Sequence, residues 1–121
     1  MIKKLLPILF VLIITSCSKE VPLRQTVERN GITYEVNSEE PFTGTVVLFH
    51  ENGQLSYKGN FKDGKMVGLW EGYHQNGQVH YKGNYKDGER DGLWETYDVN
   101  GNLESKDNYK DGELEVFFLE K

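Results

Sequence analysis

The sequence predicts an all-β protein, an elongated antiparallel β-meander built from 24-residue β-hairpin repeats. Three blocks align without a gap, at residues 44–67, 68–91 and 92–115, and self-similarity at a fixed period is the signature of a repeat array. Each block places an Asn-Gly pair between two stretches of alternating apolar and polar residues, which is a strong hairpin signal. No segment of useful length shows the 3.6-residue apolar period of a helix.

Residues 1–16 have the organisation of a signal peptide, because Lys3 and Lys4 precede a ten-residue apolar run at 5–14. A run of this length is too short to cross the roughly 30 Å hydrocarbon core of a bilayer as a helix. The segment leads into Ile14-Thr15-Ser16-Cys17, which resembles the bacterial lipobox. The resemblance implies that Cys17 is acylated and becomes the first residue of the mature chain. An ordinary signal peptide with an incidental cysteine is the alternative.

The composition fits an exported protein held at a membrane by a lipid. Cys17 is the single cysteine, which excludes an intramolecular disulfide. Without residues 1–16 the chain carries 12 basic and 19 acidic side chains, a net charge of −7, so nucleic acid is a poor partner. We expect residues 17–29 to form an acylated tether and the protein to be lipid-anchored in the cell envelope. Ser18, in place of an aspartate, favours the outer membrane over the inner one.

The repeat array, residues 44–121, is expected to have imperfect ends. Residues 30–43 look like a degenerate half-repeat that caps the N-terminal end, because their apolar residues echo the first block. Residues 116–121 begin a truncated fourth repeat. In the third block Asp107 replaces the repeat glycine and Ser105 replaces a tyrosine, as expected of a terminal capping repeat.

The middle block predicts a register when Asn76-Gly77 is placed at the centre of a two-residue type I′ turn. Pairing outward sets Trp70 over Gly83 and Tyr81 over Gly72, so that rings cover backbone that glycine exposes. The same register predicts cross-strand ion pairs between Glu71 and Lys82 and between Glu95 and Lys106. The Lys-Asp-Gly sequences are expected to turn the chain into the next hairpin through a longer loop, such as residues 86–91.

This register divides the aromatic side chains between the two faces of the sheet. One face is predicted to be apolar, and it forms either the core of a thin protein or an exposed interaction surface. A second stripe on the more polar face, which includes Leu69 and Leu93, is the better candidate for exposed contacts. Tyrosine and tryptophan dominate binding hot spots, so the candidate binding residues are Trp70, Trp94 and Tyr81 on the first face and Phe49, Tyr73 and Tyr97 on the second.

No catalytic, metal or cofactor site is predicted. His50 and His74 occupy the same repeat position, but equivalent positions lie two strands apart, about 9–10 Å. Zinc needs its ligand nitrogens within about 2.1 Å of one ion. The aspartates that precede glycine are explained by turn chemistry, and the glycines do not form a phosphate-binding loop at the start of a helix. We therefore expect a protein that is not an enzyme.

The middle block carries Tyr73, Asn76-Gly77-Gln78, Tyr81-Lys82-Gly83-Asn84-Tyr85-Lys86-Asp87-Gly88 and Gly92-Leu93-Trp94-Glu95. This pattern resembles the bacterial variant of the MORN repeat, and the resemblance covers about residues 30–119. It implies a scaffold that binds protein or lipid. Similar proteins are often labelled antitoxin components of toxin–antitoxin systems, and many are lipoproteins.

The main functional hypothesis is a membrane-anchored, non-catalytic scaffold that binds another protein through an aromatic sheet face. An antitoxin or immunity role is one alternative, and it depends on the resemblance alone. The export signal argues against a cytoplasmic toxin as the target, because an exported lipoprotein would not meet it. A carbohydrate or envelope-polymer binder is the other, because rows of aromatic rings can stack on sugars.

Overall fold

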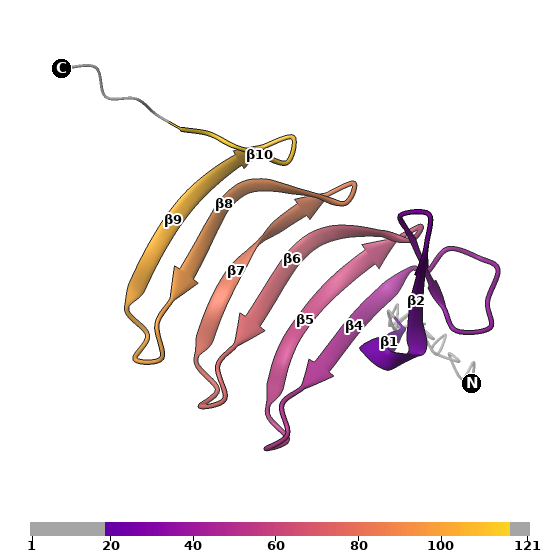
Figure 1. The fold of residues 1–121 in the computed structure, drawn as a ribbon, viewed down its shortest axis with the longest axis horizontal. Coiled ribbons are helices and arrows are strands. Elements are labelled where there is room, and N and C mark those ends of the chain that lie inside the picture. Colours follow the sequence, from indigo (N-terminus) through magenta and orange to yellow (C-terminus); the bar gives the residue numbers. More distant parts are fainter. Residues whose placement is uncertain (1–18, 117–121) are drawn as a thin grey trace, which may run out of the picture.

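A computed structural model describes residues 19–116, which form one long curved sheet and a small separate hairpin (Figure 1). The sheet has eight strands in the order β1-β4-β5-β6-β7-β8-β9-β10, and β2 pairs with β3 alone. From β4 to β10 sequence neighbours are sheet neighbours, so the predicted all-β meander of hairpins is confirmed. The predicted signal peptide, Cys17, Ser18 and residues 117–121 of the truncated repeat lie outside the described residues.

The strands of the meander, apart from the two-residue β10, are longer than those at its N-terminal end. The N-terminal elements are β1 (Glu20–Pro22), the 3-10 helix η1 (Leu23–Gln25), β2 (Thr26–Arg29) and β3 (Ile32–Glu35). The meander consists of β4 (Gly44–Phe49), β5 (Leu55–Lys62), β6 (Lys65–Tyr73), β7 (Val79–Lys86), β8 (Glu89–Tyr97), β9 (Leu103–Lys110) and β10 (Glu113–Leu114). None of the residues from 19 to 116 belongs to a helix that is long and apolar enough to cross a membrane.

The register within each hairpin agrees with the prediction away from the turn. Trp70 lies opposite Gly83, and Glu71 lies opposite Lys82. The third repeat has the same pairing between β8 and β9. Close to the turn a bulge shifts the register, so that Tyr73 faces Val79, whereas a two-residue turn at Asn76-Gly77 would set Tyr73 opposite His80.

The Asn-Gly sequences form a different turn from the one predicted. Gly77 has a φ of +86°, whereas Asn76 is not among the residues with positive φ. The N–H of Gly77 donates to the carbonyl oxygen of His74 over 2.9 Å, and the N–H of His74 donates to the carbonyl of Gln78. This is a three-residue loop in which glycine alone takes the left-handed conformation. The predicted two-residue turn is therefore wrong.

The two-residue turns are found at the Asp-Gly sequences instead. Asp87 and Gly88 have φ values of +49° and +84°, as the two central residues of a type I′ turn require. Lys86 and Glu89 lie opposite each other on either side of this turn. The longer loop predicted at residues 86–91 is wrong, because aspartate supplies a positive φ nearly as readily as asparagine does.

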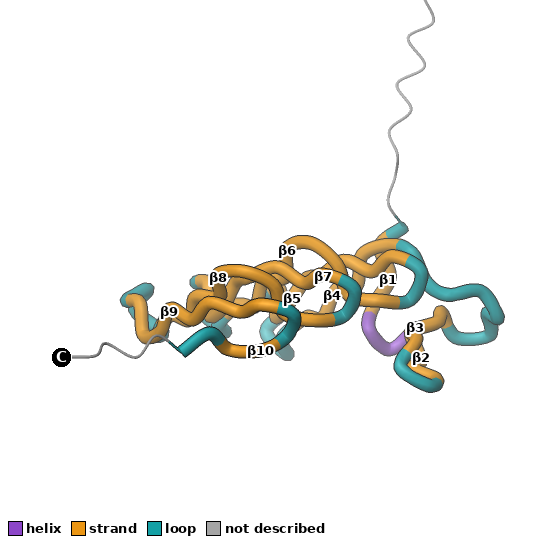
Figure 2. The backbone as a smooth tube through the Cα atoms, turned by 90° about the horizontal axis from the view of Figure 1, so that it is seen from above, coloured by secondary structure: helices purple, strands orange, loops and turns teal. Residues whose placement is uncertain are grey.

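Residues 19–29 belong to the fold, unlike the tether predicted for 17–29. β1 pairs in parallel with β4, with Val21 opposite Val46. Val21, Phe42 and Val46 form a small buried core. The β2–β3 hairpin joins the end of the predicted tether to the start of the predicted cap and lies on one side of the sheet (Figure 2).

Candidate binding surface

A row of aromatic rings crosses one face of the sheet at right angles to the strands. We call it the aromatic ladder, and its members are Phe42, Phe61, Trp70, Tyr85 and Trp94. Successive ring centroids lie 6.0, 5.4, 5.5 and 5.0 Å apart. The last three contacts are edge-to-face, the arrangement that the charge distribution of aromatic rings favours. The ladder is the continuous core of the array.

Each tryptophan of the ladder covers a glycine of the strand before it. A methyl group at Gly59 would lie 2.0 Å from the ring of Trp70, and one at Gly83 would lie 2.2 Å from Trp94. The prediction that Trp70 covers Gly83 is therefore wrong, although the two residues face each other in the register. β6 bends at Gly68, which has a φ of +65°, and the register against β5 shifts beside it.

The indole nitrogens anchor this arrangement. Trp70 Nε1 donates to the carbonyl oxygen of Asn60 over 3.2 Å, and Trp94 Nε1 donates to that of Asn84 over 3.1 Å. Both tryptophans are almost fully buried, so they support the surface more than they form it. The predicted contact of Tyr81 with Gly72 is present, because a methyl group at Gly72 would lie 2.2 Å from the Tyr81 ring.

Two hollows lie along this aromatic face. One of about 600 Å³ lies between the N-terminal elements and the start of the ladder, and Leu23, Thr33 and Phe61 line it. The other, of about 380 Å³, lies farther along the meander, and we call it the aromatic groove. Its lining residues are Tyr57, Met66, Trp70, His80, Tyr81, Tyr85, Arg90, Trp94, Thr96 and Asp107.

Arg90 closes the ladder at its C-terminal end. Its guanidinium lies 4.4 Å above the centre of the Trp94 ring and 5.2 Å from that of Tyr109, and it donates to the Tyr109 hydroxyl over 3.0 Å. In such cation–π contacts the guanidinium is attracted to the electron-rich face of the ring. Sequence reasoning missed this residue. The available signal was the repeat alignment, in which Arg90 follows Phe42 and Met66 at 24-residue spacing.

Two tyrosine hydroxyls in the groove have no hydrogen-bond partner among residues 19–116. They belong to Tyr57 and Tyr81, which stand at equivalent repeat positions and stack on Trp70 and Trp94, with centroids 6.1 and 6.3 Å apart. Burial raises the pKa of both phenols above 10.0. Both therefore stay protonated at neutral pH and can donate a hydrogen bond to a ligand.

The opposite face carries the second predicted stripe. Phe49, Leu69 and Leu93 are 56, 44 and 41 % exposed, whereas Tyr73 and Tyr97 are half-buried. Both tyrosines interact with carboxylates of the same strand, since Tyr73 donates to Glu71 and Tyr97 donates to Glu95.

The predicted cross-strand ion pairs are not formed on that face. Within the described chain the ion pairs join Lys19 to Glu35 and Lys58 to Glu20. Lys82 faces Glu71 but lies 5.7 Å above the ring of Tyr97. The predictions of the Glu71–Lys82 and Glu95–Lys106 pairs are wrong because tyrosine hydroxyls take up the two carboxylates.

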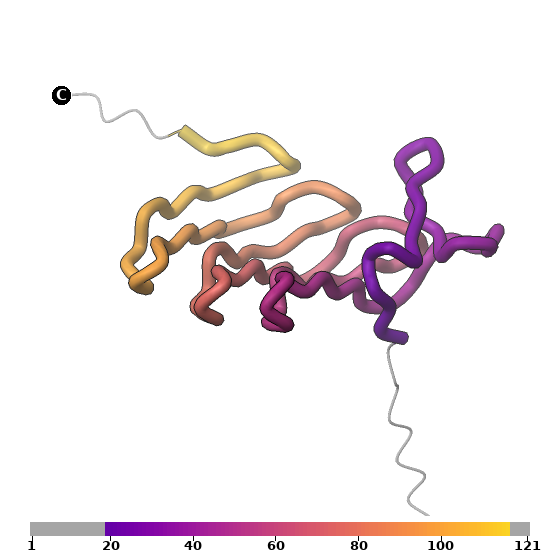
Figure 3. The backbone as a smooth tube through the Cα atoms, turned by 60° about the horizontal axis from the view of Figure 1, so that its bottom comes forward, coloured from indigo at the N-terminus to yellow at the C-terminus, as the bar shows by residue number. Residues whose placement is uncertain are grey.

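The repeated histidines hold neighbouring hairpins together. The Nε2 atoms of His50 and His74 lie 2.7 and 2.8 Å from the carbonyl oxygens of Tyr73 and Tyr97, each 23 residues farther along. A carbonyl oxygen only accepts, so Nε2 carries the proton. The side chains of Asn52 and Asn76 donate to the next turn in the same way. Figure 3 shows these turns side by side along one edge of the sheet.

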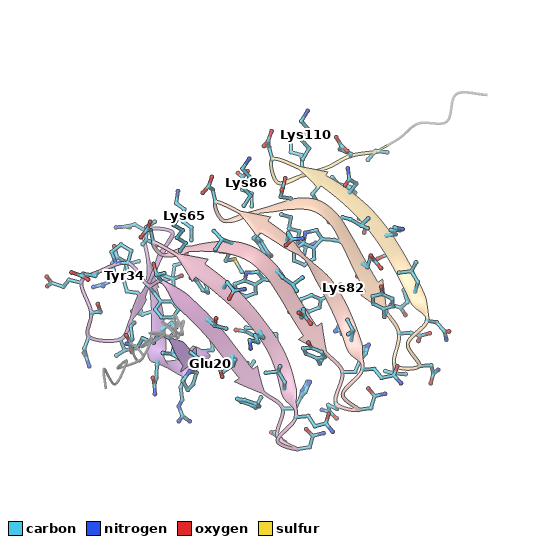
Figure 4. The ribbon with its side chains drawn as sticks, turned by 180° about the vertical axis from the view of Figure 1, so that it is seen from behind. Glu20, Tyr34, Lys65, Lys82, Lys86 and Lys110 are labelled. Carbon is cyan, nitrogen blue, oxygen red and sulfur yellow. The ribbon has the colours of Figure 1, made fainter. Side chains whose placement is uncertain are left out.

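The Asp-Gly turns are joined along the other edge by backbone atoms. The N–H groups of Gly88 and Gly112 donate to the carbonyl oxygens of Met66 and Arg90 over 2.9 and 3.1 Å. Lys65, Lys86 and Lys110 follow one another along this edge (Figure 4). Over the part of the chain that the structure describes, no group of side chains has the composition and spacing of a metal site.

The geometry defines a scaffold of stacked hairpins with an aromatic face. The MORN repeat variant model matches residues 42–63, 66–87 and 90–111. These matches cover more than half of the chain and coincide with the three hairpins, so the chain belongs to the MORN repeat variant family. Members of this family are generally non-catalytic scaffolds that bind proteins or membranes. Comparison with curated proteins gave no match, and comparison with solved structures gave none either.

Proposed function

We propose that this chain is a membrane-anchored, non-catalytic scaffold that binds another protein in the aromatic groove. The observation that carries the proposal is the open hollow over the ladder, where half-buried tyrosines surround two supporting tryptophans. Its volume of about 380 Å³ lies within the usual range for ligand sites. Tyrosine, tryptophan and arginine, which line it, are the residues that contribute most to protein interfaces.

The two faces of the sheet differ as candidate interfaces. On the aromatic face the rings are locked by packing, so little side-chain entropy is lost when a partner binds. On the opposite face Leu69 and Leu93 each lie opposite an asparagine of the next strand, while Phe49 lies opposite Leu55 at the end of the array. Scattered apolar side chains of this kind are normal on a protein surface. The aromatic groove is therefore the preferred site.

Photo-crosslinking in cells distinguishes the two faces. A photoreactive amino acid is placed at His80, which is exposed and lines the groove, and in a matched variant at Leu69 on the opposite face. We expect one dominant protein adduct from position 80 and none from position 69. An adduct confined to position 69 would move the interface to the opposite stripe. The absence of any protein adduct would favour an envelope polymer, and a toxin among the adducts would establish the antitoxin role.

The membrane anchor is a separate part of the proposal and is supported by the lipobox-like sequence that ends at Cys17. Strand β1 begins at Glu20, so an acyl group on Cys17 would hold the first edge of the sheet close to the bilayer. We expect Cys17→Ser to move the protein from the membrane fraction to the soluble fraction without loss of its β-sheet circular dichroism. Fractionation of the envelope then tests whether the anchor lies in the outer membrane.

A further inference from the structure

We infer that the occupant of the aromatic groove is a proline-rich segment in the polyproline II conformation, with a basic side chain at the β9 end. This inference rests on the proposed function, because it names the partner chemistry of the same site. Three properties of the groove carry it: the spacing of its rings, its unpaired hydroxyl donors and its charge.

The spacing of the rings matches the polyproline II helix. Equivalent rings of successive repeats stand two strands apart, about 9.5 Å, and two steps of 5.5 and 5.0 Å carry the ladder from Trp70 to Trp94. A polyproline II helix repeats every three residues at about 3.1 Å each, roughly 9.3 Å per turn. A segment lying across the strands would therefore present the same side of its helix to both repeats.

An extended β-strand does not match this spacing. Its side chains return to the same face every two residues, about 6.6–6.8 Å, so a strand that fits one ring would miss the next. Grooves lined by aromatic rings are also the surfaces that dock preformed polyproline II segments, because little entropy is lost on binding.

The hydroxyl donors complement the backbone of such a segment. A polyproline II helix makes no internal hydrogen bonds, so its carbonyl oxygens are available to a partner. The hydroxyls of Tyr57 and Tyr81 have no partner among the described residues and recur one repeat apart. Proline lacks an N–H group, and the groove correspondingly offers donors at the two positions where the ligand offers acceptors.

The charges of the groove give the ligand a direction. Between Tyr57 and Trp94 the charged lining group is Arg90, whose guanidinium is already held by Trp94 and Tyr109. Asp107 lies beyond Trp94, at the position where earlier repeats have glycine, and it forms no ion pair within residues 19–116. A basic side chain at this end of the ligand would complement its carboxylate.

Peptide titration of the purified full-length protein in detergent micelles tests the spacing. The probe is a peptide with a Pro-x-x-Pro-x-x-Pro core and one flanking lysine, and the comparison peptide has the same composition with Pro-x-x-x-Pro spacing. Both tryptophans of the chain belong to the ladder, so their fluorescence reports binding. We expect the first peptide to bind about tenfold more tightly than the second, a difference of 1.4 kcal/mol. Equal affinity, or no binding of either peptide, would overturn the inference.

Three conservative variants test the contacts. Tyr81→Phe keeps the ring but removes the donor, and we expect affinity to fall about fivefold. Asp107→Asn should weaken binding of the lysine-flanked peptide and leave a neutral peptide unaffected. Tyr73→Phe, on the opposite face, is the matched control and should change the affinity for neither peptide. If Tyr81→Phe and Tyr73→Phe behave alike, the assigned donor is wrong.

The failure of this inference is distinguishable from failure of the proposed function. A protein adduct at position 80 whose crosslinked segment is helical or lacks proline would retain the groove as an interface and exclude the polyproline II occupant. Competition by a cell-wall oligosaccharide, but by no peptide, would exclude both.

Discussion

The first and third hairpins share one motif but differ in how deeply they are buried. In the first, Val46 is fully buried, lies beside Val21 of the neighbouring strand β1 and packs with Phe42. In the third, Leu103 is 52 % exposed, whereas Leu55, at the equivalent position of the first, is half-buried. The motif therefore sets the geometry of each hairpin, whereas segments outside the motif decide how much apolar surface is buried. The aromatic groove lies along the meander between Tyr57 and Asp107, away from the small core at the N-terminal end.

The largest expected difference in stability between the two ends concerns the repeat position that Gly59, Gly83 and Asp107 occupy. Gly59→Ala would push a methyl group into the ring of Trp70, 2.0 Å away. We expect a loss of about 3 kcal/mol in the free energy of unfolding, since overpacking a core forces rings and backbone to shift. Urea denaturation followed by tryptophan fluorescence measures it.

Asp107→Ala is the matched control, because residue 107 is the equivalent position in the third repeat. Its side chain lines the groove and covers no described ring, so we expect a change within about 0.5 kcal/mol. A similar loss for both variants would show that the glycine position matters for a reason other than the tryptophan above it.

Removal of buried methyl groups should have the next largest effect on the free energy of unfolding. Val46→Ala should cost about 2 kcal/mol, because it leaves a cavity in the small core next to Val21. Leu103→Ala in the third hairpin removes a larger but half-exposed side chain and should cost no more than about 0.5 kcal/mol. Denaturation midpoints of the two variants compare the ends directly, and the reverse order would refute the burial gradient.

The side chains that join neighbouring Asn-Gly turns should contribute less to the free energy of unfolding. Asn76 donates to the carbonyl of Val99 over 2.7 Å and accepts from the N–H of Gln78 over 3.0 Å. We expect Asn76→Ala to cost about 1 kcal/mol. Asn100→Ala is the control in the last turn, where Asp98 accepts the turn hydrogen bonds instead, and it should be nearly neutral. Equal losses would contradict the assigned contacts.

The smallest effect is a titration on the face opposite the ladder. The hydrogen bond to Glu71 is the main reason that the pKa of Tyr73 is raised from 10.0 to about 12. A raised pKa means that the stabilising interaction is fully present below pH 10 and is lost as the pH rises to about 12. Phenolate absorbance should show several late-titrating tyrosines, because the pKa values of Tyr57, Tyr81 and Tyr97 are raised as well, and the difference spectrum against Tyr73→Phe isolates the contribution of Tyr73. Glu71→Gln should move its midpoint back toward 10, and an unchanged midpoint would exclude Glu71 as the cause.

The sequence was sufficient for the repeat, the hairpin register and the aromatic face. Alternation and the 24-residue period place Trp70 opposite Gly83 without any structural information. The turn types were not predictable from the dipeptides, because Asn-Gly fits both a two-residue loop and a three-residue loop with glycine at its end. Once the Asn-Gly loop is assigned three residues, Asp-Gly becomes the two-residue turn.

Two further errors, in the contact of Trp70 and in the tether, come from interactions between repeats and from long-range strand pairing. The ring of Trp70 leans toward Gly59 because of the bend at Gly68, and one hairpin considered alone does not reveal it. The strand at Glu20–Pro22 is three residues long and has no readable period. It forms because Val21 meets Val46, a partner far along the chain. Arg90 was missed because a charged residue stands where the earlier repeats have Phe42 and Met66, and Asp107 was interpreted as a capping substitution instead of a groove residue.

The turn at Asp98 is bonded differently from the two turns before it. Earlier turns reach forward to the next hairpin through His50 and His74, whereas Asp98 accepts from Asn100 and Asn102 of its own turn. A second copy of residues 68–91, inserted before residue 92, would form hydrogen bonds with a hairpin on each side and would lengthen the groove by one repeat. A copy appended behind it would meet a turn that keeps the asparagine, as Asn100, but has Asp98 in place of the histidine that donates to the next hairpin. Asp98, with Ser105 and Asp107 on β9, thus marks the residues that protein engineers would restore to the middle-repeat sequence before adding repeats behind the third.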